Sequence, residues 1–151
     1  MAEEIIQTVD ERGAKFALTG RWYTHRVFTW ACTTATNGSL TATAMDNDSL
    51  SQLRGLYVHR CIVEPGTPNP TANSDLTITD EWDYDILNAL GTDALDATGN
   101  ATLAVYCGTF LSPYPLCGPL TLTVTGNSVD SAQFAIHLIL TELPALVVPA
   151  S

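Results

Sequence analysis

The sequence is poor in basic residues and has none after Arg60. Of its 151 residues, 6 are Lys or Arg and 16 are Asp or Glu, which gives a formal net charge of -10. Binding to nucleic acid depends on neutralising phosphates, and anionic membranes attract the same cationic side chains. The charge therefore argues against nucleic acid and membrane as partners and favours a basic protein surface. The alternative is that net charge serves only solubility.

Long apolar runs and targeting signals are also missing. The longest apolar tract, residues 134–140, is interrupted by His137 and is shorter than the roughly 18 residues of a membrane span. The acidic segment Met1–Asp10 lacks the apolar core of a secretory signal. We therefore expect a soluble protein that is synthesised in a cytoplasm.

The four cysteines show no CxxC spacing, which argues against a zinc ribbon or a thioredoxin-like site. Cys107 and Cys117 flank a proline-rich loop and are placed to pair if two strands meet there. For a cytoplasmic protein we expect free, buried thiols.

Threonine alternates with apolar residues along much of the chain, as in Leu120–Thr125. A period of two with β-branched residues is typical of antiparallel strands that have one solvated face. With Phe134, Ile136, Leu138 and Leu140 on one side of a following strand, residues 119–141 predict a hairpin.

Eight or nine short strands separated by turn signals indicate an all-β sandwich or barrel. Helix is limited to one or two short candidates, at residues 46–52 and 83–90. We expect residues 1–30 to form an N-terminal arm that contributes strands at most, and residues 31–151 to form the β-sandwich domain.

Catalytic motifs are scarce: the sequence has no GxGxxG, P-loop or GxSxG motif. The acidic stretch Asp80–Asp85 has the oxygen ligands that calcium prefers, but it lacks the EF-hand spacing and reads more simply as a solvated turn. His25, His59 and His137 lie within predicted strands at spacings that indicate no metal site, so we expect them to be structural. We expect no enzymatic activity, cofactor or bound metal.

Aromatic residues offer a second kind of site. Trp22, Trp30 and Trp82, with Tyr23 and Tyr84, are candidates for a platform that stacks on sugars. Aromatic side chains in strands more often serve a core or an interface.

Two stretches, Cys61–Leu87 and Pro119–Leu140, resemble small structural proteins of tailed bacteriophages. The first has a Pro/Thr/Asn-rich loop followed by Asp75-Leu-Thr-Ile-Thr-Asp80, and the second has Leu120-Thr-Leu-Thr-Val before Asn127. The resemblance covers about residues 56–140 and is nearest to head decoration, or cement, proteins. It implies an antiparallel β-sandwich or jelly-roll module that forms homotrimers on the capsid surface.

The resemblance implies a virion protein that binds the major capsid protein and clamps neighbouring capsid subunits. Residues 1–50 depart from the group and are unusually rich in arginine and aromatic residues, which leaves a tail or collar role open. A tail or fibre module that binds a host glycan is the alternative. We expect the N-terminal segment to contact neighbours through its basic and aromatic residues: Arg12, Phe16, Arg21, Trp22, Tyr23, Arg26, Phe28 and Trp30.

Overall fold

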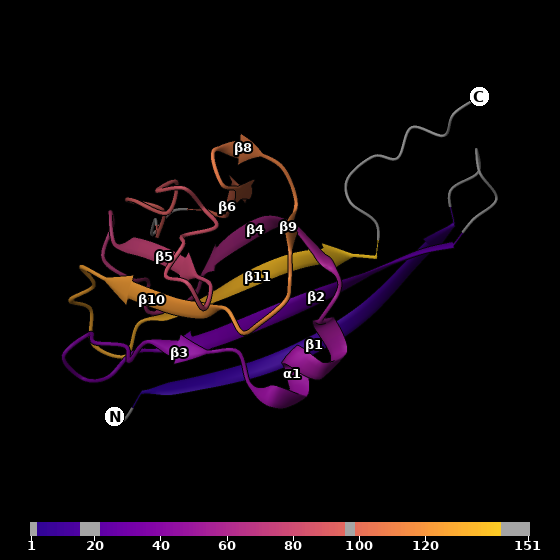
Figure 1. The fold of residues 1–151 in the computed structure, drawn as a ribbon. Coiled ribbons are helices and arrows are strands. Elements are labelled where there is room, and N and C mark those ends of the chain that lie inside the picture. Colours follow the sequence, from indigo (N-terminus) through magenta and orange to yellow (C-terminus); the bar gives the residue numbers. More distant parts are fainter. Residues whose placement is uncertain (1–2, 16–21, 96–98, 143–151) are drawn as a thin grey trace.

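A computed structural model describes residues 3–15, 22–95 and 99–142, which form two packed antiparallel sheets, a separate two-stranded hairpin and one short helix (Figure 1). In chain order, the first half has β1 (Glu4–Lys15), β2 (Trp22–Thr33), β3 (Thr43–Ala44), α1 (Asn47–Leu53), β4 (Tyr57–Pro65) and β5 (Asp75–Thr79). The second half has β6 (Ala101–Ala104), β7 (Tyr106–Cys107), β8 (Phe110–Leu111), β9 (Tyr114–Pro115), β10 (Thr121–Thr125) and β11 (Gln133–Thr141). Within these ranges, no helix is long and apolar enough to span a bilayer.

The larger sheet has six strands in the order β1-β2-β11-β4-β6, with β9 also paired to β4. The smaller sheet has the order β3-β10-β5 and packs over one face of the larger sheet, while β7 and β8 form a separate hairpin. The predicted all-β sandwich with antiparallel strands and at most two short helices is confirmed.

The core lies between the two sheets and is built by alternation. On β10, Leu122 and Val124 are buried while the threonines between them face outward, as the sequence predicts. The same period of two buries one face of the larger sheet. Its inward side chains include Phe28, Trp30, Val58, Val63, Phe134, Ile136, Leu138 and Leu140.

The predicted hairpin at residues 119–141 is wrong in its pairing. β10 pairs with β3 and β5, whereas β11 pairs with β2 and β4, so the loop at 126–132 crosses from one sheet to the other. Alternation places both strands against one core but does not say which strands they pair with.

The boundary predicted at residue 30 divides a strand. β2 runs from Trp22 to Thr33 and pairs along one edge with β1 and along the other with β11. Its side chains Phe28 and Trp30 are fully buried. Residues 22–30 are therefore part of the sandwich, and β1, which the sequence analysis missed as a strand, is its edge.

Of the two helical candidates, only the first forms. The carboxylate of Asp46 accepts a hydrogen bond of 2.7 Å from the amide of Ser49 and caps α1. The segment at 83–90 is made of turns, with Asn88 and Ala89 at positive φ. There the carboxylate of Asp85 accepts hydrogen bonds from the amides of Leu87 and Ala89. These bonds compete with the backbone hydrogen bonds of a helix.

β4 departs from simple alternation at His59. Leu140 pairs with Val58 and Ile139 pairs with Arg60, so the register shifts between them and His59 is an extra residue. Val58 and Cys61 therefore both point into the core, although an uninterrupted alternation would place them on opposite sides. The other face of β4 is half-buried or exposed, so the strand is buried on one face only.

Candidate functional site

The outer face of the larger sheet is not covered by any described element. The smaller sheet packs against the opposite face. The strand register aligns side chains from several strands in rows. One row is Ile6, Ala31, Ala135 and Glu64, and another is Asp10, Val27, Ile139 and Arg60.

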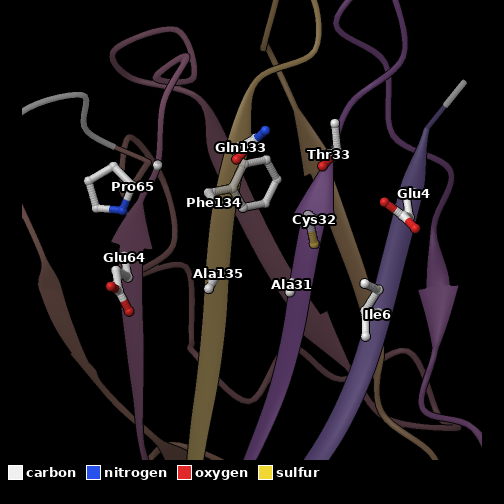
Figure 2. Close-up of a pocket in the computed structure, with 11 residues that line it drawn as sticks. Glu4, Ile6, Ala31, Cys32, Thr33, Glu64, Pro65, Gln133, Phe134 and Ala135 are labelled. Atoms are coloured by element: carbon white, nitrogen blue, oxygen red, sulfur yellow. The ribbon is translucent and has the colours of Figure 1, made fainter. Parts of the chain in front are cut away.

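At one end of this face lies a shallow hollow of about 280 Å³ (Figure 2). Its floor contains Ala31 and Ala135, whose small side chains leave space between taller neighbours. Glu4 and Ile6 stand on the β1 side, and Glu64 stands on the β4 side. The side chain of Ile6 is 51% exposed. The hollow therefore offers an apolar floor between two carboxylates.

A line of hydrogen bonds fixes the carboxylate on the β4 side. Glu64 Oε2 lies 2.8 Å from Nε2 of His137, and Nδ1 of His137 lies 2.8 Å from Oγ1 of Thr29. A neutral His137 donates from Nε2 to Glu64 and accepts the proton of Thr29 at Nδ1. These side chains come from β2, β11 and β4, which are adjacent in the sheet.

The hydroxyl of Thr29, the imidazole of His137 and the carboxylate of Glu64 follow one another as in a catalytic triad. The backbone around Thr29, however, does not support acyl transfer. Thr29 lies within a strand that is paired on both sides, so the sheet ladder engages the backbone around it. Stabilising an oxyanion requires N–H groups aimed at the reacting oxygen. The arrangement therefore supports a positioned Glu64 better than a catalytic centre.

The acidic stretch Asp80–Asp85 is occupied by its own loop. Asp80 Oδ1 accepts from the amides of Trp82 and Tyr84, at 2.8 and 3.0 Å, and Oδ2 accepts from the hydroxyl of Tyr114 at 2.7 Å. Asp85 likewise accepts from three backbone amides. No group of three potential metal-ligating side chains occurs among the described residues. The carboxylates of Asp80 and Asp85 therefore stabilise the turns of their own loop.

Asp80 gives this loop a pH dependence. Burial raises the pKa of Asp80, but the hydrogen bonds from Tyr114, Tyr84 and Trp82 outweigh burial and hold the pKa below its usual value. A carboxyl group with a lowered pKa in the folded state stabilises that state above its unfolded pKa of about 4, and the contribution is lost as pH falls through the folded pKa.

We therefore expect Asp80→Asn to destabilise the protein at pH 7 and to have a smaller effect as the pH falls below about 4. Urea denaturation of both proteins from pH 3 to pH 7 measures this difference. A difference in unfolding free energy that stays constant over this range would contradict the role given to Asp80.

The aromatic platform proposed from the sequence does not assemble as a set. Trp30 is fully buried, whereas Trp82 is 82% exposed on the turn after β5. Tyr84 stacks with Tyr114, their ring centroids 6.5 Å apart, and its hydroxyl donates to the carbonyl of Gly108. Of the residues proposed for the platform, Trp82 and Tyr84 remain candidates, and Tyr114 joins them as the stacking partner of Tyr84.

The predicted contact residues separate into three groups. Phe28 and Trp30 are fully buried, so they are unavailable to a partner, and this part of the expectation is corrected. Arg26 is half-buried and donates to the carbonyl of Gln52. Phe16 and Arg21 lie outside the described residues, while Arg12, Trp22 and Tyr23 are placed on strands by their backbone alone.

The cysteines are free, but only two are buried as expected. Burial raises the pKa of both Cys32 and Cys61 to about 12, so these thiols stay protonated in the core. Cys107 and Cys117 are exposed and are not joined by a disulfide.

Sequence reasoning missed the hollow and both of its carboxylates. The available signal was the alternation in β11, which places Ala135 and His137 on the face opposite Phe134 and Ile136. Glu4 and Glu64 reach that face only through the pairing of strands that are distant in the sequence.

A scan with protein-family models and searches of curated proteins and of solved structures found no match for this chain.

Proposed function

We propose that this chain is a non-enzymatic structural protein of a tailed-phage virion, which decorates the outer surface of the head. In this role it binds the major capsid protein as a homotrimer and clamps neighbouring capsid subunits. The observation that carries the proposal is the outer face of the larger sheet, which no described element covers and on which the small and apolar side chains of Ile6, Ala31 and Ala135 lie between the carboxylates of Glu4 and Glu64. The sequence resemblance to head decoration proteins supports the same role.

The physical basis is adhesion by a rigid surface. A sheet face held by pairing on both sides of β2 and β11 changes little on binding, so little conformational entropy is lost. Apolar side chains such as Ile6, which is 51% exposed, and Ile139 supply contact area, and the acidic surroundings match a basic capsid surface. Several copies on one head multiply individually weak contacts.

We expect Ile139→Gln to weaken binding to purified phage heads at least tenfold, because it puts a polar amide at the centre of the open face. Co-sedimentation with heads from which the protein has been removed measures the affinity. Thr125→Gln, at an exposed position at the end of β10 in the smaller sheet, is the matched control and should bind like the wild type. Wild-type protein that stays in the supernatant would contradict the proposal.

A glycan-binding tail or fibre module is the second candidate, and the exposed Trp82 favours it. Sugars stack on exposed aromatic rings, and carboxylates such as those of Glu81 and Asp83 accept hydrogen bonds from their hydroxyl groups. Host polysaccharide should then quench tryptophan fluorescence in the wild type but not in Trp82→Ala. The decoration role predicts no such quenching.

A further inference from the structure

Three of the four edges of the two packed sheets are short or covered in the described part of the chain. An open strand edge offers unpaired N–H and C=O groups to other chains, and proteins limit such edges in these two ways. β3 has two residues and β6 has four. β5 is covered by the loop that follows it, because backbone hydrogen bonds join Ile86 to Ile78 and Leu76 to Gly91.

β1 is the exception at the fourth edge. It is 12 residues long, and it pairs with β2 in an unbroken register without a bulge or a proline. Among the described residues, backbone-to-backbone hydrogen bonds join β1 only to β2, and Figure 1 shows β1 at the margin of the sheet. Alternate residues of an antiparallel strand direct their backbone groups away from the partner. β1 therefore presents a row of donors and acceptors along its outer edge.

The loop before α1 contacts β1 through a side chain and leaves this row free. Oε1 of Gln7 accepts from the amide of Asp46 at 2.8 Å, and Nε2 donates to the carbonyl of Ala44 at 3.0 Å. Gln7 is half-buried between the exposed residues Ile6 and Thr8, so its side chain lies on the core side of the strand. These bonds use no backbone group of β1.

We infer that β1 pairs antiparallel with β1 of a second copy of the chain, about a two-fold axis at Ile6. This axis places Ile6 opposite its counterpart, Glu4 opposite Thr8, and Ile5 opposite Gln7. Ile6 is 51% exposed in the single chain, and its counterpart would cover it. The two larger sheets become one continuous sheet, with their open faces on the same side.

Charge and length select this register. An axis at Gln7 would place Glu4 opposite Asp10, and like charges directly opposite each other are destabilising. An axis at Thr8 would place Ile6 opposite Asp10, and an axis at Ile5 would pair only three residues of each strand. The axis at Ile6 pairs Glu4–Thr8 with no charge opposite a like charge. β1 is therefore complementary to itself, which makes a second copy the partner.

The contact is isologous, so it joins copies in pairs. The trimer proposed above would need a separate interface, and the pairing of β1 does not depend on a role in a phage head. It is tested on the purified chain alone, so its failure leaves the head-binding experiment unaffected.

Sedimentation velocity over a range of protein concentrations measures the dimer. We expect the wild type to show an equilibrium between monomer and dimer. Ile6→Lys and Ile6→Glu should each weaken dimerisation at least tenfold, because each places two like charges opposite each other on the axis. Both variants should keep the circular dichroism spectrum of the wild type, since Ile6 lies on the open face.

The decisive sample is an equimolar mixture of Ile6→Lys and Ile6→Glu. Only at a two-fold axis does one position meet itself, so the mixture places a lysine opposite a glutamate and dimerisation should return. Thr125→Lys and Thr125→Glu, which make the same changes in charge at an exposed position of β10, are the matched controls and should dimerise like the wild type. A monomeric wild type, equal effects of the Thr125 variants, or a mixture that stays monomeric would each overturn the inference.

Hydrogen–deuterium exchange distinguishes pairing of strand edges from a contact between sheet faces. At a concentration that makes the wild type mostly dimeric, alternate amides within Glu4–Thr8 should exchange several-fold more slowly than in Ile6→Lys. Equal exchange of these amides in the two proteins would also overturn the inference.

Discussion

Trp30→Ala should lower the free energy of unfolding by about 3–5 kcal/mol, the range for removing a large aromatic side chain from a core. Trp30 is fully buried, and its ring meets that of Phe28 edge-on, with centroids 4.6 Å apart. Its strand is paired on both sides, so the backbone cannot move far to fill the space left behind. Urea denaturation followed by circular dichroism measures the loss.

Trp30→Phe is the control for this prediction. The indole Nε1 of Trp30 is buried and has no hydrogen-bond partner among the described residues. Phenylalanine keeps an aromatic ring and removes that unpaired donor, whose burial costs about 1–3 kcal/mol. We expect Trp30→Phe to cost less than half as much as Trp30→Ala, and equal losses would contradict this account of the site.

Gly91→Ala should be the second most disruptive change, at about 2–4 kcal/mol. A Cβ atom at Gly91 would lie 1.9 Å from the carbonyl oxygen of Leu76, a backbone atom that cannot rotate away. The amide of Leu76 also donates to the carbonyl of Gly91 at 2.9 Å, so relieving the clash strains this hydrogen bond and displaces β5. Thermal or urea denaturation measures the effect.

Gly99→Ala is the matched control, because a Cβ atom there would meet nothing within 4 Å. We expect its unfolding free energy to lie within about 0.5 kcal/mol of the wild type. If both alanine variants were equally stable, close approach of the loop to β5 would not be the reason for glycine at position 91.

The alternation of side chains made the class of fold predictable, since it depends on neighbours in sequence. Leu122 and Val124 face the core and Thr123 faces outward, as expected. Pairing was not predictable in the same way. β10 and β11 follow each other closely, yet they belong to different sheets, because each finds its partners in distant parts of the chain.

The hollow was beyond the reach of sequence reasoning for the same reason. Glu4, Ala31, Glu64 and Ala135 come from four strands, and only the register of three strand pairs brings them into one row or next to it. The bulge at His59 also reverses which residues of β4 face the core beyond it. No local pattern encodes such an insertion.

The place of β11 in the larger sheet has a consequence for how the protein is made. β2 emerges early in synthesis, but the strand that covers its inner edge is encoded about a hundred residues later. Until β11 has emerged, the ladder edge of β2 and the apolar face behind Phe28 remain without their final neighbours. Completion of the fold therefore has to wait until β11 has emerged, and the nascent hairpin is exposed to aggregation until then.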